Sequence, residues 1–221
     1  VLQAGDKFPE GVKFGYLSDT FFRSIGTNRY ISWAPILDED PTVCGIPQMY
    51  DANKEWAGKK VVIVSVPGKS IEYLRIGYSK QHSSQGAFTP SCSAYHLPPY
   101  VQKFEELKSK GVDKVAFISN NDEYVLAGWG KVNKVPKGED FVVYSERASD
   151  RHGLIVQQLM LSDTKTFFSE NYGWQAGPNK GDRTGRWAMI VEKDGTISYA
   201  ENEGHLQEVK VRSIASVDSV A

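Results

Sequence analysis

Residues 86–92 read Gly-Ala-Phe-Thr-Pro-Ser-Cys, and the predicted fold is organised around them. An apolar run at 60–66 precedes them and is typical of a buried strand, whereas an amphipathic run at 99–108 follows with helical spacing. Cys92 therefore lies near a helix N-terminus, where unpaired N–H groups and the helix dipole stabilise an anion. A thiol in such a position ionises readily, which predicts a nucleophilic cysteine.

Outward from this stretch, strands alternate with helices, and we expect a single α/β domain: a sandwich with a central mixed sheet flanked by helices. The predicted strands are 61–66, 114–119 and one starting near 140, with an edge hairpin within 1–16 and a second hairpin formed by 186–191 and 196–200. The predicted helices are 53–58, about 98–110, 123–131, 166–171 and a weaker one at 207–217.

The composition is that of an ordinary globular protein of 221 residues, with 40% hydrophobic residues and a net charge of -1. This balance gives no reason to expect nucleic acid or an anionic membrane as a partner. No apolar run approaches the roughly 18 residues of a membrane span. Two cysteines and the lack of a targeting pattern at either end favour a reducing compartment, by default the cytoplasm, with the peroxisome and mitochondrion left open.

The residues Ala-Phe-Thr-Pro-Ser-Cys at 87–92 resemble the PGAFTPxC active-site signature of the atypical (type five) peroxiredoxins. Motifs similar to those of the fungal members occur in the same order along nearly the whole chain, at 44–47, 54–57, 121–131 and 185–189. The resemblance implies a thioredoxin-like fold. It also implies a thiol-dependent peroxidase that reduces hydrogen peroxide and alkyl hydroperoxides through a cysteine thiolate and a sulfenic acid, without a cofactor.

Four residues are candidates for the peroxide site. Cys92 is the candidate peroxidatic thiolate, although a lone cysteine is more often a small buried hydrophobe. Thr89 can donate a hydroxyl to the thiolate or to the peroxide, but threonine also favours turns. The resemblance assigns Arg186 to the site, where its permanent charge would lower the thiol pKa, against the commoner fate of a surface cation. Pro67 matches the signature proline by its place after a strand.

Cys44 is the candidate resolving thiol. It precedes Cys92 by 48 residues, or by 30 when residues 69–86 are left out, as the resemblance to fungal members implies. Resolution across a homodimer interface is one interpretation. In the other, Cys44 only packs and an external thiol completes the cycle. Thioredoxin or glutathione with glutaredoxin is the implied reductant.

Three segments, 17–32, 69–86 and 143–159, are additional to the family pattern. We interpret them as translated introns, since Gly68-Lys69-Ser70 can be encoded by GGTAAGT, a common intron donor sequence. Surface loops are the alternative, because the entropy of loop closure grows slowly with length. If the second segment disables the site, the protein would instead be a catalytically impaired redox sensor or interaction module.

The remaining polar candidates indicate no metal site. The four histidines are scattered without the spacing of metal ligands, so we expect a structural or solvent role for His96. Trp129 and Trp174 are expected to pack, and Asn121 with Asp122 to cap the helix that follows.

Overall fold

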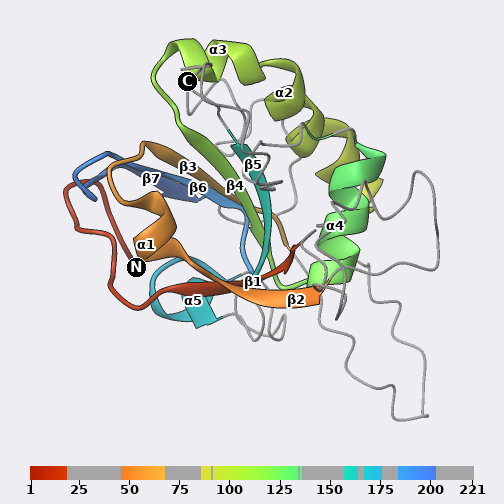
Figure 1. Cartoon of the computed structure of the whole chain (residues 1–221), viewed down its shortest axis with the longest axis horizontal. Coiled ribbons are helices and arrows are strands. Elements are labelled where there is room, and N and C mark those ends of the chain that lie inside the picture. The colour runs from red at the N-terminus through yellow and green to blue at the C-terminus, as the bar shows by residue number, and fades with distance from the viewer. Residues whose placement is uncertain are drawn as a thin grey trace, which may run out of the picture.

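A computed structural model describes the sheet, most of the helices and the residues around Cys92 (Figure 1). The described residues are 1–18, 46–67, 86–90, 92–133, 135, 157–163, 167–175 and 184–202. Several predictions lie outside them: Cys44, the strand near 140, the helix at 207–217 and most of the three additional segments.

The described strands form one mixed sheet in the order β2-β1-β5-β4-β3-β6-β7. The three central strands β3, β4 and β5 run parallel, and the other pairs are antiparallel. The predicted mixed sheet is therefore confirmed. The bounds are β1 (Lys13–Ser18), β2 (Ile46–Asp51), β3 (Val61–Ser65), β4 (Lys114–Ser119), β5 (Gln157–Ser162), β6 (Trp187–Val191) and β7 (Ile197–Asn202).

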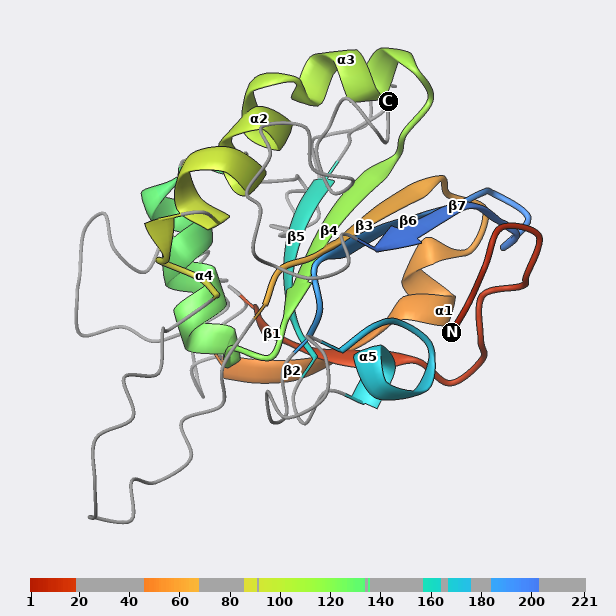
Figure 2. The same cartoon turned by 180° about the vertical axis from the view of Figure 1, so that it is seen from behind.

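Helices cover both faces of this sheet, as Figures 1 and 2 show from opposite sides. One face carries a π-helix, η1 (Cys92–His96), with α2 (Leu97–Gln102), α3 (Phe104–Ser109) and α4 (Glu123–Val132); the other carries α1 (Ala52–Trp56) and α5 (Phe167–Asn171). Successive residues of a strand point to opposite faces. Accordingly Val62 and Val64 of β3 pack on the first face, in the cluster that holds Cys92, and Val61 and Ile63 pack on the second. The expected sandwich is confirmed.

The local predictions agree with the structure where periodicity is strong. The strand at 114–119 and the helix at 123–131 are confirmed to within a residue, and the hairpin of β6 and β7 and the short helices α1 and α5 to within two. The helix expected at 98–110 is instead three pieces that begin earlier, at Cys92. Pro98 and Pro99 have no N–H group, so the α-helical ladder cannot pass through them unbroken.

The edge hairpin expected within residues 1–16 is wrong. β1 pairs with β2, so that Lys13 faces Asp51, and on its other side Gly15 bridges to Ser162 of β5. β2, and not β1, is therefore the strand at this edge of the described sheet. The alternating pattern predicted the strand correctly but holds no information on a partner more than thirty residues away.

Two additional segments overlap the sheet at their ends. Leu17 and Ser18 belong to β1, and residues 157–159, at the end of the third segment, belong to β5 and pair in parallel with β4. Every pair from Lys114–Gln157 to Ser119–Ser162 stays in register.

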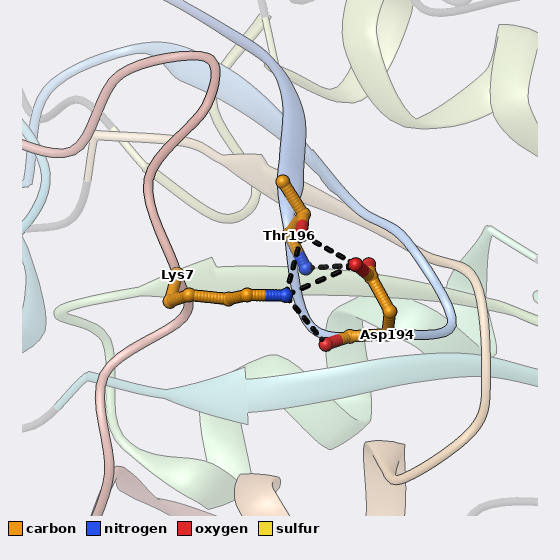
Figure 3. Close-up of polar contacts among 3 residues, drawn as sticks. All are labelled: Lys7, Asp194 and Thr196. Atoms are coloured by element: carbon orange, nitrogen blue, oxygen red, sulfur yellow. Dashed lines mark hydrogen bonds and ion pairs between the residues drawn. The ribbon is translucent and has the colours of Figure 1, made fainter.

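The N-terminal segment is attached to the turn between β6 and β7 (Figure 3). Lys7 Nζ donates to Thr196 Oγ1 at 2.6 Å and to the carboxylate and carbonyl oxygens of Asp194, both at 3.0 Å. Hydrogen bonds from the hydroxyl and the N–H of Thr196, together with Lys7, hold the pKa of Asp194 well below its usual range.

None of the helices that the structure describes is long and apolar enough to cross a membrane.

Candidate active site

Cys92 is the first residue of η1 and is completely buried. The predicted place of this cysteine at a helix start is confirmed, although the first turn is a π-helix. π-Helical turns are rare and occur frequently at functional sites. The π-helical turn at Cys92 therefore indicates a functional site around the sulfur.

The turn before Cys92 holds the Thr89 hydroxyl in place. Thr89 Oγ1 donates to the carbonyl oxygen of Gly86 at 2.7 Å, and the Thr89 N–H donates to the same oxygen at 3.1 Å. Phe88 has a φ of 64°, in the left-handed region that bulky residues rarely adopt, and its ring is 54% exposed. The hydroxyl has one proton, which it donates either to Gly86 or to the thiolate of Cys92, whose pKa a hydrogen bond from Thr89 lowers.

Asn121 anchors this turn to the end of β4. Its Oδ1 accepts from the N–H of Ala87 at 3.1 Å and from the hydroxyl of Ser119 at 3.0 Å. Its own carbonyl accepts from Ser162 Oγ at 2.8 Å. The cap predicted for α4 is confirmed for Asp122, which accepts from the Val125 N–H at 2.9 Å, but is wrong for the Asn121 side chain. Asn121 is thus a residue of the site that the sequence reasoning missed.

Arg186 reaches Cys92 from the start of β6. Ala188 and Ile190 lie in the cluster around Cys92, and the two-residue period of a strand gives Arg186 the same orientation. Its Nη1 and Nη2 lie 3.6 and 3.7 Å from the Cys92 sulfur, and only 5% of its surface is exposed. The predicted pairing of Arg186 with Cys92 is therefore seen in the geometry.

Gly185 fixes the approach of Arg186. The Gly185 N–H donates to the Trp174 carbonyl at 2.6 Å, and its own carbonyl accepts from Ser65 Oγ at 2.9 Å. A Cβ atom on Gly185 would lie 2.7 Å from that Trp174 oxygen, closer than real contacts allow. The close backbone approach that positions Arg186 therefore requires glycine.

His96 is the second residue of the site that sequence reasoning missed. Its Nδ1 and Nε2 lie 2.7 and 3.1 Å from Arg186 Nη1, its side chain is buried, and it hydrogen-bonds Cys92. A solvent role for His96 is therefore wrong, because its ring is buried against Arg186. The helix also begins earlier than expected, at Cys92 rather than near Pro98. Residues four apart in a helix are neighbours, so a helix predicted from Cys92 onward would have pointed to His96.

These groups make Cys92 unusually acidic. Burial by itself raises the pKa of the thiol. The hydrogen bond from His96, the charge of Arg186 and the hydrogen bond from Thr89 outweigh burial, and together they lower the pKa from 9.0 to about 7. Far more of the molecules therefore carry a thiolate at neutral pH than an ordinary thiol would allow.

The other two predicted site residues are Pro67 and Cys44. Pro67 is buried and follows Val66, which packs in the same cluster as Cys92, whereas Cys44 lies outside the described residues. The packing roles of Trp129 and Trp174 are confirmed: Trp129 is buried against Phe117, and Trp174 lies beside Trp187. Within the described part of the chain, no three metal-ligating side chains come together.

Comparisons with known proteins agree with one another. Residues 83–217 match the Redoxin family. Peroxiredoxin Pen c 3 of Penicillium citrinum is 39% identical over 202 residues, which span 91% of this chain and 88% of that protein. Peroxiredoxin AHP1 of Chaetomium thermophilum is 35% identical over 199 residues, or 90% and 83% of the two chains. The reduced Prx3 of Vibrio vulnificus in complex with hydrogen peroxide shares the fold, with a TM-score of 0.61 over 100% of this chain and 97% of that one at 22% identity.

Proposed function

The chain belongs to the peroxiredoxin family, and from this premise we propose that Cys92 is the peroxidatic cysteine of its active site. The protein is a thiol-dependent peroxidase that reduces hydroperoxides. The observation that carries the assignment of Cys92 is the contact of both Arg186 Nη atoms with its sulfur, at 3.6 and 3.7 Å. The alternative of a catalytically impaired redox sensor is not favoured, because relatives along most of the chain are peroxiredoxins.

In the proposed reaction the Cys92 thiolate attacks one oxygen of the peroxide. A bond forms between the sulfur and that oxygen as the O–O bond breaks, so the sulfur is oxidised to a sulfenic acid and the peroxide is reduced. The second oxygen leaves as hydroxide or alkoxide and takes a proton from water. Negative charge moves from the sulfur to the oxygens during this step.

Arg186 and Thr89 are proposed to stabilise that charge. A guanidinium keeps its charge at any physiological pH and presents several N–H donors. Two of its nitrogens already face the sulfur, so a peroxide oxygen at the sulfur would lie within reach of the same charge. Thr89 is proposed to donate its hydroxyl, and Pro67, which is buried and follows Val66, is proposed to shield the site.

We propose that the sulfenic acid then condenses with a thiol, losing water, and that a second thiol–disulfide exchange restores Cys92. Cys44 of a homodimer partner or an external thiol can be the first of these thiols. Thioredoxin, or glutathione with glutaredoxin, is the proposed reductant. The two cysteines suit a reducing compartment, and we place the protein in the cytoplasm.

Peroxide consumption with dithiothreitol as reductant tests the proposal. We expect the wild-type chain to consume hydrogen peroxide and Cys92→Ser to lose this activity completely. Cys44→Ser is the matched control. Because dithiothreitol can reduce the sulfenic acid directly, that variant should keep its rate. Activity that survives in Cys92→Ser would overturn the assignment.

A further inference from the structure

We propose that His96 is a positioning residue of the peroxidase site, a neutral imidazole that accepts a hydrogen bond from Arg186 at one ring nitrogen and donates one to the Cys92 sulfur from the other. The inference rests on the proposed function of Cys92. It assigns to His96 the task of holding the guanidinium and the thiolate in one arrangement.

The contact with Arg186 determines the charge of the imidazole. Arg186 Nη1 lies 2.7 Å from His96 Nδ1 and 3.1 Å from Nε2. A guanidinium only donates hydrogen bonds and does not lose its proton, so the ring nitrogen that it meets must offer a lone pair. An imidazolium has none, and it would also bring two positive charges together within a buried site. His96 is therefore neutral when Arg186 is in place.

The same contact selects the tautomer. The shorter distance is to Nδ1, which makes Nδ1 the acceptor and leaves the proton on Nε2. Although Nε2 also lies 3.1 Å from Arg186 Nη1, we assign to its N–H the hydrogen bond from His96 that lowers the pKa of Cys92. The sulfur thus receives donors from Arg186 and from a histidine whose orientation Arg186 sets.

The fold holds Cys92 and His96 in fixed positions relative to Arg186. Cys92 and His96 are the first and last residues of η1, and the next residue, Leu97, is completely buried in the cluster that contains Cys92. His96 itself is only 3% exposed, so water cannot readily replace its ring. Loss of the imidazole would leave one buried N–H of Arg186 and one acceptor site of the thiolate without their present partner.

A neutral His96 is not the source of the proton for the leaving oxygen. A neutral imidazole N–H is a very weak acid, and Arg186 opposes formation of the imidazolium. His96 is thereby distinguished from a general acid. Its removal should change the thiol pKa and the placement of Arg186 rather than introduce or remove a separate ionisation in the rate.

The test uses His96→Leu and His96→Gln, both in the Cys44→Ser background so that Cys92 is the only thiol. The pH dependence of alkylation by iodoacetamide gives the pKa of Cys92 without any need for peroxidase activity. We expect His96→Leu to raise this pKa by about one unit or more, since a donor to the thiolate is lost. His96→Gln, whose amide both donates and accepts, should recover at least half of the shift. Tyr95→Ala, an exposed neighbour in the same turn, should leave the pKa unchanged.

The second readout is the rate with hydrogen peroxide at a pH well above the thiol pKa, where every variant is fully ionised. We expect His96→Leu to lose about tenfold or more there, because Arg186 is no longer held, and His96→Gln to lose less. A folded His96→Leu variant with an unchanged pKa and an unchanged rate would overturn the proposal. If peroxidase activity instead survives in Cys92→Ser, the function of Cys92 is wrong while the alkylation result still decides the role of His96.

Should His96→Leu fail to fold, nuclear magnetic resonance on the wild-type chain decides. The ¹⁵N shifts of the imidazole, assigned by comparison with His96→Gln, should show a neutral ring protonated on Nε2 at about pH 7. A doubly protonated ring, or a neutral ring protonated on Nδ1, would contradict the arrangement.

Discussion

The guanidinium of Arg186 lies 3.6 and 3.7 Å from the sulfur of Cys92, although 94 positions of sequence separate the two residues. The sheet explains this proximity. β6 pairs antiparallel with β3, so that Trp187 faces Ser65, and Val64 of β3 and Ala188 of β6 pack in the same cluster as Cys92. This pairing brings a cation from the last third of the chain to a thiol in its middle.

The rate of peroxide reduction should depend on one ionisation near pH 7. Burial raises the thiol pKa, but His96, Arg186 and Thr89 lower it further, from 9.0 to about 7. Below pH 7 the rate should therefore fall about tenfold per pH unit, and above pH 8 it should level off. Stopped-flow rates for the Cys44→Ser variant measure this profile. A midpoint at the ordinary thiol value of 9.0 would contradict it.

The same ionisation has a consequence for stability. The folded pKa is lower than the unfolded one, so the thiolate contributes stability fully above about pH 9 and loses it as the pH falls through 7. Compared with Cys92→Ser, the wild-type free energy of unfolding should therefore rise between pH 7 and pH 9. Denaturant titrations at the two values measure the difference, and equal slopes with pH for both proteins would contradict it.

Arg186→Met should lower the peroxide rate by about 10²-fold or more, because two N–H donors and the charge at the sulfur are lost. Arg186→Lys should recover part of the lowered thiol pKa but little of the rate. An ammonium is a point charge and cannot place two nitrogens against the sulfur, as Arg186 does at 3.6 and 3.7 Å. Alkylation and stopped-flow measurements on both variants separate the two effects. Equal rates for the lysine variant and the wild type would argue against a geometric role.

Thr89→Val should lower the rate by about tenfold or more, whereas Thr89→Ser should stay close to the wild type. The hydroxyl, rather than the methyl group, makes the 2.7 Å hydrogen bond to Gly86 and the contact with Cys92. We also expect Thr89→Val to cost about 1 kcal/mol of stability. Initial rates and thermal melts of the two variants check this, and similar rates for serine and valine would exclude the hydroxyl.

Gly185→Ala should impair both stability and rate. Its Cβ would lie 2.7 Å from the Trp174 carbonyl oxygen, and relief of that clash would shift the neighbouring Arg186. We expect a loss of about 1–3 kcal/mol. Gly111→Ala is the matched control, because Gly111 has a φ of +81° with open space around its Cβ position. That variant should be less stable than the wild type but keep its rate per folded molecule.

Asn121→Ala should lower the rate because the N–H of Ala87 loses its anchor at the start of the active-site turn. Asp122→Ala provides the comparison. It removes the cap of α4, at a cost of about 1 kcal/mol, without touching the turn. Rates measured where both variants are fully folded should therefore distinguish the effect of Asn121 from that of Asp122. A larger loss of rate in Asp122→Ala would show that α4, and not Asn121, positions the turn.

The sequence predicts well whatever depends on local pattern. The apolar run of β3, the helical spacing of α4 and the turn at Gly195 each contain their own evidence, and all three elements are present. The candidate pair of Cys92 and Arg186 came from motifs along the chain, and the structure brings the two together. The three elements depend on interactions within a few residues, whereas the pair of Cys92 and Arg186 rests on two separate motifs of the family resemblance.

The sequence fails where the deciding interaction is not local. The partner of β1 is β2 rather than a neighbour within the first 16 residues, because an alternating pattern describes a face and not a partner. Asn121 was interpreted as a helix cap from its place before α4. Its side chain instead binds the N–H of Ala87, which lies in a turn more than thirty residues earlier and leaves no local pattern. His96 was missed since the spacing of apolar residues predicted a helix only from about residue 98, while the chain forms a π-helix from Cys92 to His96.

Trapping of the sulfenic acid tests the central claim, that the Cys92 thiolate attacks the peroxide, most directly. The Cys44→Ser variant is treated with one equivalent of hydrogen peroxide in the presence of dimedone, and the modified peptide is identified by mass spectrometry. We expect a dimedone adduct on Cys92, formed faster at pH 7 than in the Arg186→Met variant at the same pH. If Cys92 stays unmodified while peroxide is consumed, or if the wild-type chain forms its adduct on Cys44 instead, Cys92 is not the residue that attacks the peroxide.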